Sequence, residues 1–599
     1  MALFSPSQSP SVVVKEVDLT GVVPNVQTST GAFVGNFNWG PVYETTLISD
    51  EAGLVSTFAA PSTTNTVDFH QAAMFLKYSS QLFVVRECDS DARNSLAVNN
   101  LTATASRGAT SASATNQKLG NLDNYETATI DSSDGAFIAR YPGALGNSLL
   151  ISICGSDSDN GGATNFNAWT YGNSFDGAPG TSSYVSGLGG KNDEIHIAVV
   201  DEDGEISGTA GTVLETYPFL SVASNAKATD GTSNYYKDVI KARSEYIYAG
   251  AFHRNGDSDG INDFSGALWD TAAVNGSQDF KSDVTFGTGQ NEWSFTGGVS
   301  SSSLGTDDIL RGFDKFEDVD NIEVDFLIAP ESIADANATT VVNDLVATAS
   351  SLRKDCVAVA SPSRNAAITL GTNAAVLACN NTYTKSSYLV QDNNYLKVFD
   401  KYNDQFIKIP AASSTAGLMA ATDLVAANWF SPAGQRRGRY LGITDIELSP
   451  NKSERDTLYK AGINPIANIP GQGIMLFGDK TNESRPSAFD RINVRRLFLG
   501  IERAIAIAGR NVMFEFNDEF TRAEFVNIVE PFLREIQGRR GITDFRVVCD
   551  STNNTAAVID RNEFVASIFI KPARSINFVT LNFVAVRTGV EFEEVVGTV

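Results

Sequence analysis

The feature that most constrains this sequence is the regular succession of helical and strand patterns in residues 490–599. Apolar residues recur at helical spacing over residues 492–508, and Gly509 follows at the point where a helix would end. The apolar run 511–516 then predicts a short strand. A helix, a strand, a second helix and further strands in close succession predict a compact α+β domain.

The second helix is predicted to begin at a capping box. Thr521 and Glu524 have the spacing at which the hydroxyl accepts a hydrogen bond from the third amide while the carboxylate reaches back to the first. Apolar residues continue at helical spacing over residues 525–536, and Gly538 marks the end. Pro531 lies inside this helix, so we expect a kink there.

Both ends of the chain have strand patterns. Residues 545–549 and 564–570 predict strands inside the C-terminal domain, and residues 576–596 form a long alternating apolar tail. Residues 11–17 predict a strand at the other end of the chain. A strand needs neighbours to pair its amides and carbonyls, so these terminal strands either close the sheet of their own chain or complete the sheet of a neighbouring chain.

At 599 residues the chain is too long for one hydrophobic core and predicts roughly three to five domains. The hydrophobic fraction of 42% is typical of globular proteins, and no apolar run approaches the length of a membrane span. The N-terminus has neither the basic start nor the apolar core of a secretion signal, so we expect a protein that is made in a cytoplasm.

The net charge of −25 is unevenly distributed along the chain. Residues 400–599 carry 24 Lys and Arg against 24 Asp and Glu, so the whole excess of acidic groups lies in residues 1–399. An acidic front and a neutral C-terminal third argue against direct nucleic-acid binding by the bulk of the chain.

Few residues suit catalysis or metal binding. The cysteines lack Cys-x-x-Cys spacing, which predicts free and mostly buried thiols: Cys88, Cys154, Cys356, Cys379 and Cys549. The histidines have no partner at ligand spacing: His70, His196 and His253. Acidic loops at Asp157/Asp159, Asp201/Asp203 and 255–260 suggest calcium, but the last has Gly266 where an EF-hand has Glu, so solvated turns are favoured. We predict no catalytic residue, no cofactor, no metal and no enzymatic activity.

Composition divides the front of the chain. Residues 1–20 predict a flexible arm that contains the first strand. Residues 21–88 and 303–400 both alternate strands with helices and predict one interrupted α/β domain. Residues 89–302 are rich in Gly, Ser, Asn and Asp and predict an inserted, mainly-β region of two lobes. Short strands are predicted in this insert at 136–140, 149–154, 194–201 and 246–251.

Several segments resemble the tail sheath proteins of contractile, myovirus-type bacteriophages, in the same order along the chain. They are residues 30–35, 39–42, 141–147, 353–359, 409–414, 429–434, 471–478, 492–497, 514–517, 545–550 and 589–594. The family often has Pro where this chain has Phe516, a departure at a turn. The resemblance covers about two-thirds of the chain, and the insert matches at only a few points.

The resemblance implies a multidomain α+β fold. Its C-terminal α+β sheath domain, residues 401–574, is expected to face the inside, and its outward-facing lobes to come from the insert. Residues 575–599 are expected to form an exchange strand, as is the N-terminal arm. The implied partners are further copies of the chain in a helical homo-polymer, the tail tube protein, and the baseplate and tail terminator proteins, without direct nucleic-acid contact or membrane insertion.

The resemblance also implies a function and its residues. The subunit is expected to polymerise around the tail tube and to contract, driving the tube through the host envelope for genome ejection, as a virion component assembled in the host cytoplasm. Strand exchange between subunits is assigned to Val12, Val13, Val14, Val17, Ile576, Phe578, Leu581, Phe583, Val586 and Phe592. A contact to the tube is assigned to Arg495, Arg496, Arg539 and Arg540, for which ordinary helix-end charge is the alternative.

Two other functions stay open at this point. One is the sheath of a phage-derived injection machine that delivers no genome. The other is a tail adhesin, a glycan-binding protein or a glycan-cleaving enzyme, because the inserted β region could bind host sugars.

Overall fold

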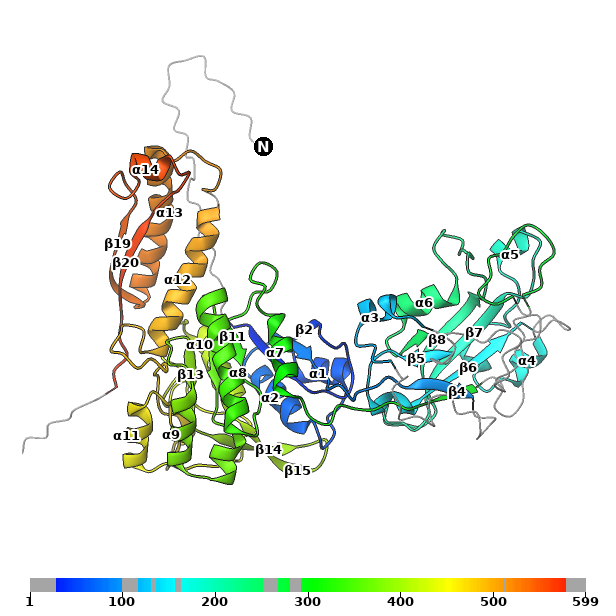
Figure 1. Cartoon of the computed structure of the whole chain (residues 1–599), viewed down its shortest axis with the longest axis horizontal. Helices are drawn as coiled ribbons and strands as arrows, with labels where there is room; N and C mark the ends of the chain where they lie inside the picture. Colours follow the sequence, from blue (N-terminus) through cyan, green and yellow to red (C-terminus); the bar gives the residue numbers. More distant parts are fainter. Residues whose placement is uncertain are drawn as a thin grey trace, which may run out of the picture. The chain divides into compact units, whose positions relative to one another are not determined.

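A computed structural model describes residues 29–99, 117–130, 136–156, 163–250, 268–280, 292–510 and 512–577. These residues divide into two compact units (Figure 1). Unit 1 holds residues 426–431 and 491–577, and unit 2 holds the rest. The predicted multidomain α+β class is confirmed. The predicted domain limits stay predictions, although the grouping of residues 432–490 with unit 2 differs from the predicted limit at 401.

Unit 2 contains a six-stranded sheet in the order β13-β12-β11-β1-β3-β2. Its strands are β1 (Gly31–Gly35), β2 (Thr45–Ile48), β3 (Leu82–Arg86), β11 (Phe326–Ile328), β12 (Val357–Ala360) and β13 (Leu389–Gln391). All neighbours run parallel except β2. β1 pairs with β11 on one side and with β3 on the other, so a single sheet joins residues from before and after the insert.

Helices cover both faces of this sheet, which is why its strands are apolar at nearly every position. The helices are α1 (Glu51–Phe58), α2 (Thr66–Leu76), α7 (Thr306–Asp314), α8 (Asp335–Ala347), α9 (Asn373–Thr382) and α10 (Ala412–Val425). Ala32 and Val34 of β1 pack in one cluster with α7 and α8, whereas Gly31 lies against Phe75 of α2. Helix α10 packs on α2 at Gly417, where an added Cβ would lie 2.4 Å from Cδ2 of Tyr78.

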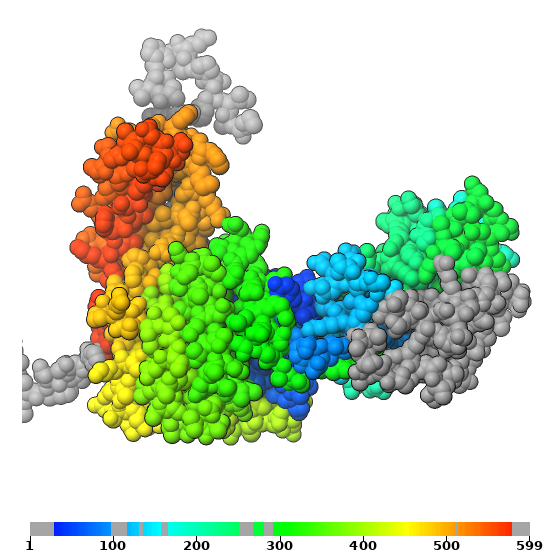
Figure 2. All heavy atoms as spheres, in the orientation of Figure 1, coloured from blue at the N-terminus to red at the C-terminus, as the bar shows by residue number. Residues whose placement is uncertain are grey.

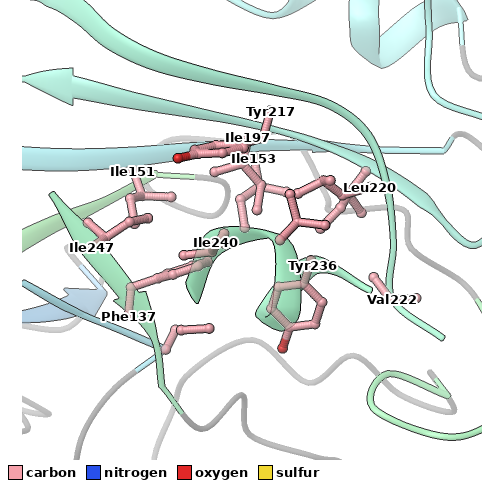
Figure 3. Packing of buried hydrophobic residues seen from close by; sticks show 14 of the residues in the cluster. Phe137, Ile151, Ile153, Ile197, Tyr217, Leu220, Val222, Tyr236, Ile240 and Ile247 are labelled. Carbon is pink, nitrogen blue, oxygen red and sulfur yellow. The ribbon is translucent and has the colours of Figure 1, made fainter. Parts of the chain in front are cut away.

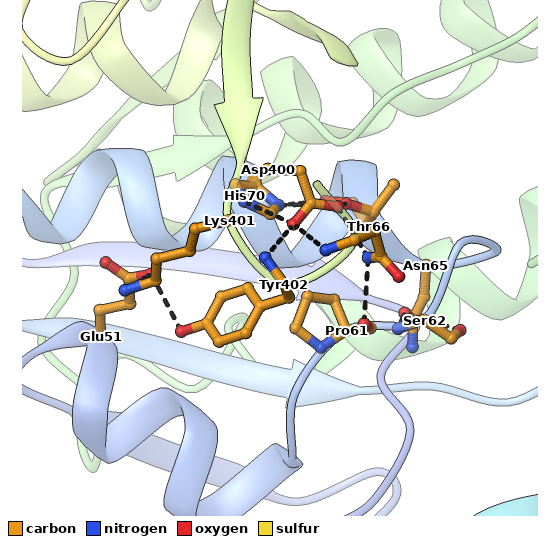
Figure 4. Close-up of polar contacts among 10 residues, drawn as sticks. Glu51, Pro61, Ser62, Asn65, Thr66, His70, Asp400, Lys401 and Tyr402 are labelled. Carbon is orange, nitrogen blue, oxygen red and sulfur yellow. Dashed lines mark hydrogen bonds and ion pairs between the residues drawn. The ribbon is translucent and has the colours of Figure 1, made fainter. Parts of the chain in front are cut away.

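Small antiparallel sheets complete this part of unit 2. Their elements are β14 (Tyr395–Asp400), β15 (Gln405–Pro410), β16 (Asp445–Ile446), β17 (Ile466–Ile469), β18 (Gly473–Leu476) and the helix α11 (Lys452–Lys460). The turn from β14 to β15 is fixed to α2 by the buried carboxylate of Asp400, which accepts hydrogen bonds from Thr66 Oγ1 and Asn403 Nδ2, both at 2.7 Å (Figure 4). His70 of α2 lies beside it, with Nε2 3.6 Å from the carboxylate.

The insert contains a seven-stranded antiparallel sheet in the order β8-β7-β6-β10-β4-β5-β9. Its elements are β4 (Leu96–Asn99), α3 (Leu122–Thr127), β5 (Phe137–Ala139), β6 (Leu149–Gly155), α4 (Ala163–Ala168), α5 (Ser183–Gly187), β7 (Glu194–Asp201), β8 (Thr212–Ser221), α6 (Tyr236–Arg243), β9 (Ile247–Ala249) and β10 (Glu292–Thr296). The four predicted strands are confirmed as β5, β6, β7 and β9. The prediction of two lobes stays a prediction, although every described strand of the insert belongs to this sheet.

One face of the insert sheet packs on helix α6 (Figure 3). Phe137, Ile151 and Ile197 of the sheet meet Tyr236 and Ile240 of the helix in a cluster of buried side chains. Because these residues alternate along their strands, each strand sends every second side chain into the cluster.

The connection between insert and α/β sheet is hydrogen-bonded through Arg86, which is 1% exposed. Its guanidinium donates to the carbonyls of Phe37 (2.9 Å), Gly40 (2.6 Å) and Pro142 (2.6 Å), the last of which belongs to the insert. Burial lowers the pKa of Arg86 from its ordinary value. The two chain crossings also lie together, since Asp89 accepts a hydrogen bond from the amide of Ser302 at 2.9 Å.

Unit 1 is built from two long helices and a hairpin. Its elements are α12 (Ile492–Arg510), α13 (Glu519–Gly538), β19 (Ile542–Val548), α14 (Ala556–Ile559) and β20 (Ser567–Pro572). In the space-filling view its orange and red segments form one continuous body (Figure 2). Within the described ranges of both units, no helix is long and apolar enough to cross a bilayer. The five cysteines are free and buried, as predicted.

Candidate assembly surfaces

The core of unit 1 forms where α12 and α13 pack against the β19–β20 hairpin. Leu497 and Ile501 of α12 meet Val529 and Leu533 of α13 in one buried cluster, and Phe545 of β19 packs on its margin. The helical spacing that predicts these two helices therefore also selects the residues of this core. Pro531 lies within α13, and the predicted kink there stays a prediction.

The hairpin has an inner and an outer face. Phe545 pairs with Ile570, and Val547 with Ile568, on the face that joins the core. On the outer face Arg546 lies opposite Phe569, which is 60% exposed. Side chains alternate between the two faces because successive residues of a strand point in opposite directions.

Both edges of this hairpin are open among the described residues, where β19 and β20 form a sheet of only two strands. An open edge presents unpaired amides and carbonyls that can bind another extended segment. A two-stranded sheet is also only marginally stable without further strands or helices against it. The hairpin is therefore a geometrically suitable acceptor for added strands.

Most residues assigned to strand exchange lie outside the described residues. Ile576 is described, follows β20 by four residues and is 84% exposed. The others have no described position: Val12, Val13, Val14, Val17, Phe578, Leu581, Phe583, Val586 and Phe592. Their assignment stays a prediction.

The four arginines assigned to the tube contact differ in exposure. Arg495 and Arg496 are only 7% and 4% exposed on α12. Arg539 caps α13, lies 5.0 Å from the ring centre of Trp429, and pairs with Glu535 at 3.3 Å. Arg540 follows in a left-handed conformation with φ 68°. Arg539 and Arg540 are therefore better placed for an external contact than Arg495 and Arg496.

The connection between α12 and α13 differs from the prediction in two respects. The strand predicted over 511–516 is wrong, because residues 512–515 form turns and Phe514 has φ 71°. The capping box at Thr521 is also wrong, because Asp518 caps α13 by accepting a hydrogen bond from the Thr521 amide at 2.8 Å. The apolar run that suggested a strand is instead exposed to solvent, and no part of the sequence prediction identified it as a surface.

The acidic loops contain no metal-binding cluster in the part of the chain that the structure describes. The carboxylate of Asp201 accepts hydrogen bonds from Ser148 Oγ (2.6 Å), the Ser207 amide (2.6 Å) and the Gly204 amide (3.0 Å). Such a carboxylate is occupied in fixing its own turn. The loops at Asp157/Asp159 and 255–260 lie outside the described residues.

Comparisons with known proteins agree with this architecture. The model of the phage tail sheath protein central domain matches residues 303–482, and that of the phage tail sheath C-terminal domain matches residues 484–585. This chain thus has the central and C-terminal parts of a sheath, one a component of unit 2 and the other of unit 1.

Relatives that align over nearly the whole chain, including the insert, give the same result. The chain is 33% identical to the tail sheath protein of Vibrio phage KVP40 over an alignment 681 positions long, which covers 98% of this chain and 99% of the relative. It is 33% identical to the tail sheath protein of Enterobacteria phage T4 over 668 residues, with the same coverage. It belongs to the phage tail sheath protein family, the structural components of contractile virion tails.

A solved structure shows the same fold. The sheath tail protein Lin1278 from Listeria innocua aligns with 92% of this chain and 93% of its own, with a TM-score of 0.53 and 11% sequence identity.

Proposed function

We propose that this protein polymerises as a helical sleeve around the tail tube, and that contraction of the sleeve drives the tube through the host envelope for genome ejection. The family supports self-assembly into a sheath. The observation on this chain that carries the proposal is the β19–β20 hairpin, which has no further strand on either edge among the described residues and is followed by an apolar segment of strand-like sequence.

In the proposed assembly, residues 11–17 and 576–596 of neighbouring subunits add as strands to the edges of β19 and β20. Main-chain hydrogen bonds then connect the subunits, while the flanking segments allow the attached units to rotate during contraction. The long tail suits this role because its sequence continues the alternating apolar pattern of the hairpin strands. No nucleotide is required, since the work of contraction comes from the difference in subunit contacts between two sleeve states.

The tail tube, the baseplate and the tail terminator are the further partners in this proposal, and assembly takes place in the host cytoplasm. The tube contact falls on Arg539 and Arg540. End-to-end similarity to sheath proteins of phages supports a virion sheath over an injection machine without a genome, and over a tail adhesin.

Two truncations test strand exchange. Chains that lack residues 1–17 or 575–599 should remain folded, with unchanged circular dichroism. In electron micrographs they should fail to form the striated tubes that we expect of the full chain. A chain that lacks only residues 1–10 is the matched control, because it shortens the same arm but keeps the strand 11–17. Normal tubes from both truncations would falsify strand exchange.

A second test separates the tube contact from self-assembly. Replacing Arg539 and Arg540 by Gln should weaken assembly around tube protein more than assembly of the sheath alone. Equal loss in both assays would show that the two arginines serve the subunit or the sleeve and not the tube.

A further inference from the structure

Four exposed apolar side chains lie within eight residues of one another in the sequence, in and beside the loop between α12 and α13. Phe514 is fully exposed, Phe516 is 84% exposed, Phe520 75% and Met513 58%. They form what we call the loop patch. Soluble proteins seldom expose several large apolar side chains within eight residues unless a partner covers them.

The loop patch is held in place by the rest of unit 1. Asn517, in the middle of it, donates to the carbonyl of Glu563 at 2.8 Å and to Asn554 Oδ1 at 3.3 Å. Arg522 donates back to Asn517 Oδ1 at 2.8 Å. In Figure 1 this loop lies at the end of unit 1 that also carries α14. The loop that carries these exposed side chains is therefore held by hydrogen bonds to the rest of unit 1.

Acidic groups outnumber basic ones around the loop patch, where Arg522 is the basic neighbour of Asp518. Glu515, Asp518 and Glu519 lie within the same eight residues and are all exposed. Two copies of this patch placed face to face would bring six carboxylates together, which Coulomb repulsion disfavours. The patch consequently needs a partner surface that is apolar with basic neighbours.

Unit 1 carries such a surface on the outer face of its hairpin. Phe569 is exposed there, Arg546 lies directly opposite it, and Lys571 follows two residues along the same face. Lys571 pairs with Asp544 at 3.0 Å, and Arg546 interacts electrostatically with Asp550, so this face carries two basic groups, each with an acidic neighbour. We call Arg546, Phe569 and Lys571 the hairpin patch.

We propose that the loop patch of one subunit docks on the hairpin patch of a second copy of this chain. The proposal rests on the proposed function, because it assigns one contact of the helical sleeve. A contact between two different patches of the same unit is heterologous, and such contacts, when they do not close into a ring, generate open helical assemblies. The contact uses the faces of the hairpin and the loop, so it is separate from strand addition at the hairpin edges.

Cysteine cross-linking of full-length chains tests the contact directly. The five native cysteines are buried, so Phe516→Cys and Phe569→Cys introduce accessible thiols on exposed positions. A short bis-maleimide should join the two variants when they are mixed, and should give no dimer of either variant alone. Ile333→Cys, at a position 67% exposed in unit 2, is the matched control and should give no dimer with either.

Charge reversal supplies the second arm. Glu519→Arg and Arg546→Glu should each raise the concentration needed for tube assembly by about tenfold, the effect of losing one modest charge pair at a repeated contact. The double variant should recover most of the loss. Circular dichroism of each variant should match the full chain, because both side chains are exposed.

The outcomes separate this contact from the proposed function. Tubes of the full chain without the mixed cross-link, or with dimers of one variant alone, overturn the contact and leave the sheath function intact. Monomers at every concentration with no cross-link overturn both. A Phe516→Cys thiol that does not react with a simple maleimide in the monomer would show that the chain covers its own loop patch, which also overturns the contact.

Discussion

Asp392 gives a quantitative test of the packing inside unit 2. Its carboxylate is fully buried after β13 and accepts hydrogen bonds from Ser361 Oγ at 2.8 Å, Thr415 Oγ1 at 3.2 Å and the amide of Asn394 at 3.1 Å. Burial raises the pKa of Asp392 from 3.8 to about 7, and these hydrogen bonds offset only part of that rise. Over most of the range between pH 4 and pH 7, the Asp392 carboxyl is therefore protonated in the folded state and ionised in the unfolded chain.

The sign of the effect follows from proton linkage. Between pH 4 and pH 7 the folded state binds more protons at this site than the unfolded state, so the free energy of unfolding falls as pH rises. A shift of about three pKa units corresponds to about 4 kcal/mol, reached near pH 7 and constant above it. Below pH 4 both states are protonated and the contribution is absent.

Asp392→Asn removes this titration with little change of shape. Its amide oxygen can still accept hydrogen bonds from Ser361 Oγ and the Asn394 amide, and its NH2 group can donate to Thr415 Oγ1, as the protonated acid can. Relative to the native chain, the variant should be about equally stable at pH 4 and more stable by at most about 4 kcal/mol at pH 8. Urea unfolding at four pH values, read by hydrogen exchange of peptides from β12 and β13, measures this difference.

Asp544→Asn is the matched control. This residue is exposed, and the hydrogen bond and charge of Lys571 lower its pKa, so its small contribution has the opposite sign and is lost as pH falls. A stability difference between Asp392→Asn and the native chain that stays constant from pH 4 to pH 8, or that shrinks as pH rises, would refute the reasoning about Asp392.

Three further substitutions test named contacts. Leu533→Ala should lower the free energy of unfolding of unit 1 by about 2–5 kcal/mol, because it leaves a cavity at a fully buried position. Hydrogen exchange should accelerate in α13 of unit 1 and stay unchanged in β11 of unit 2. Equal acceleration in both would contradict independent unfolding of the two units. Gly417→Ala should destabilise unit 2 by about 1–3 kcal/mol, because the added Cβ would lie 2.4 Å from the Tyr78 side chain. Gly371→Ala is the control, because Gly371 has a left-handed backbone with open space around it and tests the conformational cost alone. An unchanged free energy of unfolding for Gly417→Ala would disprove the close packing. Arg86→Met should leave three buried carbonyls without their donor, and proteolysis between residues 86 and 96 should increase; unchanged proteolysis would show that Arg86 does not anchor the insert.

The sequence predicts elements well where one local pattern decides them. Helix α12 is found because its apolar spacing is continuous and Gly509 lies near its end. Strand β7 is found because β-branched residues are concentrated in it: Ile195, Ile197, Val199 and Val200. Strand β8 was missed because polar residues and Pro218 interrupt its apolar pattern, and only its pairing with β7 makes it a strand. Pairing between distant segments is not contained in local periodicity.

The errors around residues 511–521 have the same origin. A short apolar run such as that around Phe514 and Phe516 is compatible with either a strand or an exposed loop. Whether it forms a strand depends on the presence of a partner strand. Asp518 and Thr521 both have side chains that can cap a helix N-terminus, and in the structure α13 begins after Asp518. For the candidate site, the terminal strands expected from their alternating sequence stay a prediction, because most of their residues lie outside the described ranges. The hairpin to which they are proposed to add became visible only when β19 and β20 were paired in three dimensions.

Because Asp89 and Ser302 are hydrogen-bonded to each other, the insert begins and ends at the same place and could be exchanged as a unit. The chain leaves the sheet and returns to the same point, and the neighbours β11, β1 and β3 pair with one another without a strand of the insert between them. The bond from Arg86 to the carbonyl of Pro142 is the contact that a replacement for the insert would have to supply. Such a junction accepts a foreign domain whose own termini are close together, or a short turn in place of 89–302. Every subunit of an assembled tail would then display the grafted domain, which makes the position suited to multivalent presentation.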